Sequence, residues 1–317
     1  MNTQNLHEFY TRTTSAFPDA IVFPQDQMTF QQAYDRARAR AAFLQQKNFK
    51  KGDVIALLSR NSAEWVITYL AVTMTGCIVS IFDTNLTNDL YEDMLKQAGA
   101  KGIFYSKEFE HTFPGIQGFL TGLDTSSAEA SAFLTDTSVG PQDVCTLLFT
   151  SGTTSTPKIV GLTHSNIIRT AESAIAQMQF DTTHTAMALL PLYHVYGLIA
   201  AFIAPYGAGA KIVFQTSLKG TDIMKTMQTY KITYVPAVPQ LWEIIFNRIA
   251  GKLKSDSTLR YNVFMFFIVN APQLRAMGLS WLLKKVFKPI HDLFGGHVRL
   301  MISGGARLKR KYFRYYN

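Results

Sequence analysis

The stretch LLFTSGTTSTPKIVGLTH, residues 147–164, passes from an apolar, strand-like run into a segment crowded with hydroxyl groups. Six of the nine residues from 150 to 158 carry a hydroxyl, and Lys158 adds a positive charge. This composition is most often that of a solvated turn. It is also typical of a loop whose backbone N–H groups surround an anion, with lysine as a point charge for phosphate. The pattern is not a Walker A loop, because Pro157 precedes the lysine and Ile159 follows it.

The composition of the whole chain indicates a globular protein. It has 317 residues, of which 47% are hydrophobic and 17% are charged, enough for one large or two ordinary domains. Both cysteines, Cys77 and Cys145, lie in apolar runs and lack metal-ligand spacing, which indicates core thiols in a reducing compartment. The N-terminal residues do not resemble a signal peptide, so we expect a cytoplasmic location.

Two uncharged stretches, 65–82 and 182–210, are long enough to raise the question of a membrane span. The second stretch contains prolines and glycines, which break a chain into short elements. Both stretches lie within a regular alternation of strands and helices. We therefore expect buried strand–helix units here rather than membrane spans.

The two halves of the chain differ strongly in charge. Residues 1–150 contain 11 Lys and Arg against 16 Asp and Glu, a net charge of −5, whereas residues 151–317 contain 20 against 6, a net charge of +14. A basic half suits phosphate groups or an anionic membrane surface. The alternative is that acidic complementary segments are simply absent from this sequence. No zinc, RNA-binding or helix-turn-helix pattern is present, so we expect no nucleic-acid partner.

Strands and helices are expected to alternate along the chain. The expected strands span 54–58, 77–82, 102–105, 144–149, 186–190, 211–214 and 233–235. The expected helices span 29–46, 62–75 and 88–99, and a further helix, capped by Thr163 or Ser165, runs to Met178. This order predicts an α/β fold with a largely parallel sheet covered by helices on both faces. The polar region 107–142 is expected to be a connector.

Three further segments place ligand-type residues at the ends of expected strands. PLYHVYG (191–197) puts His194 after an apolar strand. TYVPAVPQLW (233–242) contains two prolines expected to break a strand into a rigid turn, and VRLMISGGARL (298–308) ends a strand in two glycines. A single histidine in apolar surroundings is usually a core residue, and a glycine pair alone is a weak signal. Because ligands bind at the carboxyl ends of strands in open α/β sheets, we expect 191–197 and 236–242 to face one another across an apolar cavity.

Together these segments point to a family. TSGTTSTPK, PLYHVYG, VPAVPQLW and ISGGARL, in this order and spacing, resemble the AMP-forming adenylating enzymes, which include the acyl-CoA synthetases, and the resemblance extends over the whole chain. The stretch from Leu259 to Gly296 looks most like the long-chain fatty acyl-CoA synthetases. The resemblance implies an α/β fold of largely parallel sheets flanked by helices, as in the large N-terminal domain of adenylate-forming enzymes, with two α/β subdomains.

The resemblance also implies a two-step reaction. A fatty carboxylate attacks the α-phosphate of ATP to give acyl-AMP and pyrophosphate, and the thiol of coenzyme A then accepts the acyl group. Mg²⁺ would bridge phosphate oxygens, and no residue of this chain is assigned to the metal. Gly304, Gly305 and Ala306 would lie against the adenine. The residues that would hold the phosphates are Thr150, Ser151, Gly152, Thr153, Thr154, Ser155, Thr156 and Lys158.

On the acyl side, the resemblance implies that His194 and Tyr196 border the substrate carboxylate, with His194 as the catalytic residue. Val238 and Pro239 would line the path of the acyl chain. The expected partners are therefore a fatty acid, ATP and coenzyme A. The mixture of aromatic, aliphatic and lysine residues in 261–288 suits peripheral contact with the inner surface of a membrane, and an ordinary helix pair packed on the core is the alternative.

The sequence departs from the family pattern at several positions. Ser155 and Ile159 stand where the family usually has glycine, and Arg307 stands where it has proline or a small residue. The sequence ends at Asn317, before the family's later segments and its C-terminal domain. The resemblance therefore implies that 1–317 is an incomplete N-terminal AMP-binding domain that is inactive alone. The alternative is a non-catalytic nucleotide- or acyl-binding protein derived from the same fold.

Overall fold

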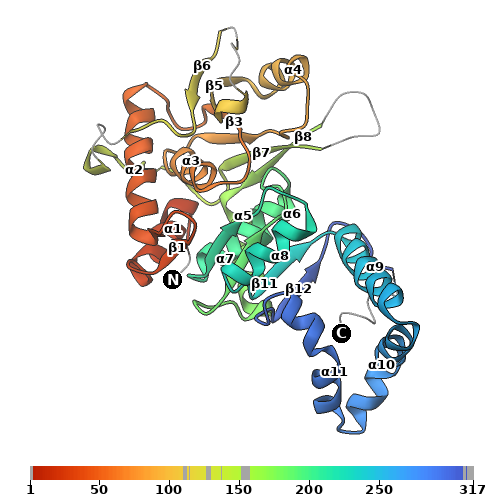
Figure 1. The fold of residues 1–317 in the computed structure, drawn as a ribbon. Helices are drawn as coiled ribbons and strands as arrows, with labels where there is room; N and C mark the ends of the chain where they lie inside the picture. The colour runs from red at the N-terminus through yellow and green to blue at the C-terminus, as the bar shows by residue number, and fades with distance from the viewer. Residues whose placement is uncertain are drawn as a thin grey trace.

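The computed structural model describes residues 3–109, 113, 115–125, 130–136, 138–150, 158–309 and 312. Figure 1 shows the two larger sheets with helices packed on them, and the helices of residues 239–293 extending from the second sheet. The fold is α/β with mostly parallel strands flanked by helices, which confirms the predicted fold class. Among the described residues, no helix combines the length and the apolar character needed to cross a bilayer.

The first sheet has, within the described residues, six strands in the order β6-β5-β3-β4-β7-β8. All neighbouring pairs are parallel except β7 and β8, which form an antiparallel pair. The strands are β3 (Val54–Leu58), β4 (Ile78–Ile81), β5 (Ala100–Tyr105), β6 (Gln117–Leu120), β7 (Val144–Thr150) and β8 (Lys158–Thr163).

The second sheet has, over the same described ranges, four parallel strands in the order β10-β9-β11-β12. They are β9 (Thr185–Ala188), β10 (Lys211–Phe214), β11 (Tyr234–Ala237) and β12 (Leu300–Ser303). A small antiparallel pair, β1 (Ile21–Phe23) and β2 (Met28–Thr29), lies near the N-terminus.

The helices cover these sheets and form the extension. They are α1 (Leu6–Ala16), α2 (Phe30–Gln46), α3 (Ala63–Met74), α4 (Asn88–Ala98), α5 (His164–Met178), α6 (Val195–Gly197), a π-helical segment (Leu198–Ile203), α7 (Ala204–Gly207), α8 (Gly220–Thr229), α9 (Pro239–Asp256), α10 (Thr258–Ala276) and α11 (Ser280–Leu293). Short 3-10 turns span Lys107–Phe109 and Ala130–Ala132.

The two-residue period of the strands divides their side chains between separate cores. In β3, Ile55 and Leu57 enter a large core shared with α2 and α3, whereas Ala56 and Leu58 enter a smaller one beneath α4. In β9, Ala186 joins the large core, and Met187 packs on the other face of the second sheet. The large core therefore lies between the two sheets and joins them, as expected for strands buried on both faces.

Local sequence signals explain the starts of several helices. Thr29 and Thr163 each form a capping box at the start of a helix, with Gln32 and Asn166 as the reciprocal partners. Ser62 caps α3 by accepting a hydrogen bond from the backbone of Trp65. The predicted helices at 29–46, 62–75 and 88–99, and the one ending at residue 178, are confirmed within one or two residues.

Two expectations about strands were wrong, and a third strand was not predicted. The connector 107–142 contributes the edge strand β6, and the segment after the hydroxyl-rich loop forms β8 rather than only leading into a helix. Both are edge strands with few buried side chains, so they lack the alternation that reveals a strand. Pro236 does not end its strand but lies within β11. Strand β11 pairs with β9 at Tyr234, so Pro236 does not need to donate a backbone hydrogen bond to β9.

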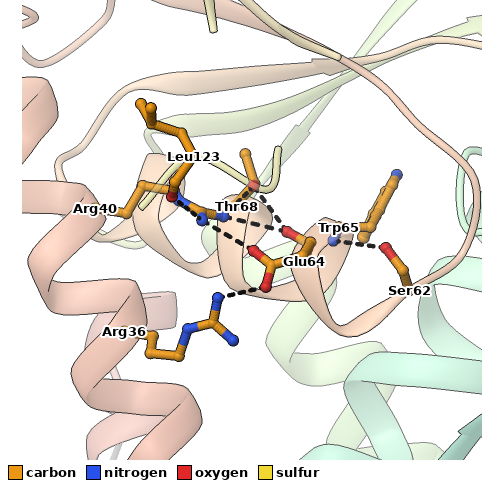
Figure 2. Close-up of polar contacts among 7 residues, drawn as sticks. All are labelled: Arg36, Arg40, Ser62, Glu64, Trp65, Thr68 and Leu123. Carbon is orange, nitrogen blue, oxygen red and sulfur yellow. Dashed lines mark hydrogen bonds and ion pairs between the residues drawn. The ribbon is translucent and has the colours of Figure 1, made fainter. Parts of the chain in front are cut away.

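A partly buried ion pair holds α2 against α3 (Figure 2). The Arg40 side chain is 1% exposed, and its guanidinium donates to the Glu64 carboxylate (2.9 Å), to the Thr68 hydroxyl (2.7 Å) and to the carbonyl of Leu123 (3.2 Å). Arg36 reaches the same carboxylate from a more exposed position. Burial lowers the pKa of Arg40, and the adjacent carboxylate opposes that shift. The network therefore connects two helices and the chain that follows β6.

His164 is a second buried polar link. Its Nδ1 accepts a hydrogen bond from the backbone N–H of Leu6 (3.1 Å), which joins the start of α5 to the start of α1. Burial lowers the pKa of His164 to about 4 from its ordinary value of 6.5, although nearby Asp143 favours the charged form; Lys51 disfavours it and pairs with Asp143 at 2.7 Å. The folded protein therefore holds this imidazole neutral.

We expect the free energy of unfolding to fall by about 2 kcal/mol through His164 between pH 7 and pH 5. The folded pKa lies below the unfolded one, so the unfolded chain binds the extra proton as the pH falls through this window. The measurement is urea denaturation at several pH values. The control is His164→Asn, whose side-chain oxygen can accept from Leu6 without titrating. His7, whose pKa is also lowered by burial, contributes equally to both proteins. Identical pH slopes for the two proteins would contradict the assignment.

Candidate functional site

The carboxyl ends of the second sheet form the floor of the candidate site. The strands β9, β11 and β12 are parallel, and Ala237 pairs in register with Ser303. The residues that follow these strands therefore emerge at the same edge of the sheet, where ligands bind in open α/β folds. The segments 191–197, 238–244 and 304–306 are the ones that emerge there.

A cavity of ≈ 460 Å³ lies at this edge. Its size falls within the range of small-molecule pockets, and most of its lining is apolar. The expected juxtaposition of 191–197 with 236–242 is confirmed, because both segments contribute to the lining. The lining residues are Leu189, Leu190, Pro191, His194, Tyr196, Gly197, Leu218, Val238, Gln240, Leu241, Ile244 and Gly305.

His194 stands at the polar end of this lining. It has an extended backbone immediately before α6, its carbonyl accepts from Leu198 N–H (2.8 Å), and its side chain makes no capping bond. The exposed imidazole lies edge-on to the ring of Tyr193, with 4.7 Å between centroids. The turn is tight: a side chain added at Gly197 would place its first carbon 2.0 Å from the carbonyl oxygen of Pro191. Glycine at 197 is therefore what allows His194 to sit at the cavity.

Tyr196 occupies the space that Gly304 leaves free. A first side-chain carbon at Gly304 would lie 2.5 Å from the Tyr196 ring, and the tyrosine hydroxyl donates to the carbonyl of Ile302 (3.4 Å). Burial raises the pKa of Tyr196 to about 12, so the phenol stays neutral. The Trp242 indole N–H donates to the same carbonyl (3.2 Å). The small residue at 304 thus accommodates this aromatic ring, whereas Gly305, at φ +78°, is the glycine that reaches the cavity.

Not every predicted site residue lies on this cavity. Val238 lines it, but Pro239 is buried at the first position of α9, and Ala306 is exposed outside the lining. Gln240, Leu241 and Ile244 line it instead, and they share one face of α9 just after the proline. The helical period starting at Pro239 is a signal that could have identified these three residues.

The ends of the hydroxyl-rich loop are adjacent. Thr150 and Lys158 are paired in register across β7 and β8, and the Thr150 hydroxyl donates to the Lys158 carbonyl (3.3 Å). Both side chains are exposed. Residues 151–157, which include the predicted phosphate ligands Ser151–Thr156, lie outside the described residues. Their role remains a prediction from the sequence.

A second, polar pocket of ≈ 190 Å³ lies where the two sheets meet. Three apolar residues, Leu189, Pro191 and Leu218, line both this pocket and the apolar cavity. Sequence reasoning missed this pocket, although polar residues that directly follow β3, β4 and β10 are the same type of signal as His194. The polar residues of its lining are Arg60, Asn61, Thr84, Asn85, Tyr193, Gln215 and Thr216.

Asn61 fastens the two sheets together beside this pocket. Its amide nitrogen donates to the carbonyls of Ala188 (3.2 Å) and Leu190 (2.7 Å), and its oxygen accepts from Leu192 N–H (3.0 Å). The loop after β3 thus holds the turn that leads to His194. On the opposite side, Asn85 donates to the Tyr193 hydroxyl (2.9 Å). Burial and the charge of nearby Asp83 raise the pKa of Tyr193 to about 12.

A further apolar cavity of ≈ 260 Å³ adjoins Tyr196 from the side of α5. Tyr196 lines both apolar cavities. The other lining residues are Thr170, Ala174, Met178, Phe180, Val195, Ile199, Ala200, Tyr234 and Ile302. Within the described part of the chain, no group of three or more His, Cys, Asp or Glu side chains could hold a metal ion.

Comparison with known families gives one match that spans nearly the whole sequence. The family model described as AMP-binding enzyme matches residues 10–317. Among curated relatives, an oxalate–CoA ligase of Arabidopsis thaliana is 27% identical over 81% of this chain. A 4-coumarate-CoA ligase of Narcissus pseudonarcissus is 25% identical over 84%, and the peroxisomal long chain acyl-CoA synthetase 7 of Arabidopsis thaliana is 25% identical over 92%. The chain spans about half the length of these relatives: 54%, 50% and 46%.

Solved structures agree with the fold. The N-terminal domain of FACL13 from Mycobacterium tuberculosis matches with a TM-score of 0.69 and 21% identity, covering 76% of this chain and 64% of that one. The O-succinylbenzoate coenzyme A synthetase of Bacillus subtilis, in complex with AMP, matches with a TM-score of 0.67 and 22% identity, covering 74% and 62%. These likenesses establish the architecture of the chain.

Proposed function

The chain belongs to the AMP-binding enzyme family, and we propose that it is the N-terminal portion of a fatty acid–CoA ligase. In this proposal the protein activates a fatty carboxylate with ATP to acyl-AMP and transfers the acyl group to coenzyme A. Residues 1–317 would form an incomplete AMP-binding domain of two α/β subdomains, and catalysis would need residues outside them. The coarser conclusion, membership of the adenylate-forming CoA ligases, rests on the family match and on the relatives.

The observation that carries the fatty-acid proposal is the apolar cavity with a single imidazole at its edge. Transfer of an aliphatic chain from water to such a lining is favourable by about 25 cal/mol for each Å² of apolar surface buried. His194 can donate a hydrogen bond to a carboxylate at the end of that chain. The neighbouring cavity behind Tyr196 would extend the available length. A long-chain acyl-CoA synthetase is among the relatives, whereas other relatives are named for 4-coumarate and oxalate.

The nucleotide would lie on the hydroxyl-rich loop. A carboxylate and a triphosphate repel each other, so donors must neutralise and align both before they react. Thr150, Ser151–Thr156 and Lys158 would supply N–H, hydroxyl and ammonium donors to the phosphates. Gly305 would allow the adenine to approach the backbone. Mg²⁺, when bound, would neutralise phosphate charge.

Location and membrane contact are parts of the same proposal. We place the protein in the cytoplasm, at the inner surface of a membrane, because its substrate would be exchanged with the bilayer. The alternative, a non-catalytic nucleotide- or acyl-binding protein with this fold, would keep the cavities and bind ligand without turnover.

Exchange of labelled pyrophosphate into ATP tests the proposal. With the whole gene product, we expect exchange driven by long-chain fatty acids and only background exchange with 4-coumarate or oxalate. Lys158→Ala should raise the ATP concentration for half-maximal exchange by about 10- to 100-fold, because a hydrogen bond to a charged group contributes about 1.5–3 kcal/mol. Lys211→Ala, an exposed lysine at the amino end of β10, is the matched control and should have no effect.

Each failure has a separate meaning. A preference for 4-coumarate or oxalate would reject the fatty acid and keep the adenylating activity. Absence of exchange with every carboxylate, together with measurable ATP binding, would favour the non-catalytic alternative. Equal effects of Lys158→Ala and Lys211→Ala would reject the placement of the phosphates.

A further inference from the structure

The helices α9, α10 and α11 form an arm with a small core of its own. Figure 1 shows the arm extending from the end of the second sheet, with the α10–α11 turn far from the first sheet. Its core contains Phe246 from α9 and Phe264 from α10, with Phe287 from α11 packed edge-on to Phe264 at 5.7 Å between centroids. The inner faces of the three helices are therefore already satisfied.

The outer face of α10 is apolar as well. Leu259, Val263 and Phe266 recur at spacings of four and three, so they form a stripe along one side of the helix. All three are exposed, and the Phe266 side chain is 58% exposed. The buried residues Phe264 and Ile268 lie on the opposite side. Among the described residues nothing covers this outer stripe, and an exposed apolar face of this kind is typical of an interaction site.

The outer face of α11 is basic with an aromatic end. Trp281, Lys284, Lys285 and Lys288 recur at spacings of three and four, so they share one face, and all four are exposed. Trp281 is 62% exposed and lies next to the turn between α10 and α11, beside Met277, which is 71% exposed. Tryptophan and methionine thus stand at the tip of the arm, with lysines behind them.

The charge of this hairpin is mostly positive. Residues 258–293 contain five Lys and Arg and one acidic residue, Asp292, which pairs with Lys288 at 2.7 Å. The basic residues are Arg260, Arg275, Lys284, Lys285 and Lys288.

We propose that the α10–α11 hairpin docks on an anionic lipid bilayer, with Met277 and Trp281 inserted at the level of the headgroups and Lys284 and Lys285 against the lipid phosphates. An apolar stripe, a tryptophan at the tip and flanking lysines are what an interfacial helix requires. A second copy of the chain is a poorer partner, because a two-fold contact would bring the same cations against each other. The docking specifies the membrane contact of the proposed function and rests on it, but the surface is separate from the cavities. A failure of vesicle binding would therefore leave the pyrophosphate-exchange test unaffected.

Vesicle flotation tests the docking. The full chain should float with vesicles of phosphatidylcholine and phosphatidylglycerol, much less with phosphatidylcholine alone, and less again as salt rises. Lys284→Ala with Lys285→Ala should weaken partition on the order of 30-fold, about fivefold for each lysine. Trp281→Ala should weaken it by about tenfold through lost apolar insertion. These side chains are exposed, so unchanged thermal unfolding should confirm that each variant is folded.

The matched control removes the same charge elsewhere. Lys96 on α4 and Lys107 after β5 are exposed residues of the first sheet's side of the molecule, and Lys96→Ala with Lys107→Ala should leave partition unchanged. A loss equal to that of the arm variant would overturn the proposal in favour of general charge attraction. Absence of lipid-dependent flotation would overturn it outright. So would a concentration-dependent dimer in sedimentation that Trp281→Ala abolishes, since a second copy would then cover the arm.

Discussion

The Arg40→Met substitution is expected to lower the free energy of unfolding by about 3 kcal/mol. Methionine keeps the length of the apolar stem but removes every donor of the guanidinium. The Thr68 hydroxyl then loses its buried donor and keeps only its own bond to the Glu64 carbonyl (2.7 Å), while the partly buried Leu123 carbonyl and one oxygen of Glu64 each lose a donor. Urea denaturation followed by circular dichroism measures the loss.

Arg36→Met is the matched control, since Arg36 pairs with the same carboxylate but its side chain is 45% exposed (Figure 2). An exposed ion pair contributes about 0–1 kcal/mol, so this variant should change stability little. If both variants lose the same amount, the arginine pair acts through charge alone, and the buried network of Arg40 is not what joins the helices.

The Gly197→Val substitution is expected to cost about 3 kcal/mol or more and to displace the turn that carries His194. The obstacle is the backbone oxygen of Pro191 at 2.0 Å, which cannot rotate away as a side chain could. The turn would have to open, and with it the hydrogen bond from His194 N–H to Pro191 O (3.2 Å). Thermal unfolding measures the first effect, and the imidazole chemical shift in NMR reports the second.

Gly251→Ala is the control for replacing a glycine. Gly251 lies within α9, and a side-chain carbon there would meet nothing within 4 Å. Alanine should raise stability by about 0.5–1 kcal/mol through helix propensity. A Gly197→Val protein within 1 kcal/mol of the wild type would mean that the turn is adaptable and that glycine is not needed to position His194.

Features set by neighbouring residues could be predicted from the sequence. Thr29 and Thr163 predict the starts of their helices, because a capping hydroxyl accepts a hydrogen bond from a backbone N–H only three residues away. Apolar runs predict the buried strands β3 and β10. Parallel pairing within each sheet is predicted by the helices that separate consecutive strands. The position of 191–197 opposite 236–242 follows from the same rule, since parallel strands bring their carboxyl ends together.

Features set by distant residues could not be predicted. The glycine at 304 looked like an open surface for a flat ligand, yet Tyr196, far away in sequence, fills that space. The pocket around Arg60 and Asn85 needs both sheets in place, so no local pattern reveals it. Arg40 belongs to an ordinary-looking alternation of Arg and Ala along α2, and only packing against α3 distinguishes it from the exposed Arg36.

The side chain of Asn61 makes hydrogen exchange at one backbone amide depend on the contact between the two sheets. The Leu192 N–H belongs to the second sheet's loop, but its acceptor comes from the first sheet. Local fraying of the loop does not free this hydrogen, because Asn61 also holds the carbonyls of Ala188 and Leu190 and moves with them. Deuterium therefore replaces the hydrogen only when the two sheets part at this seam. The exchange rate of the Leu192 amide hydrogen therefore reports how often the two sheets separate at this seam. A molecule that bridges Arg60 and Gln215 across the pocket would lower that rate.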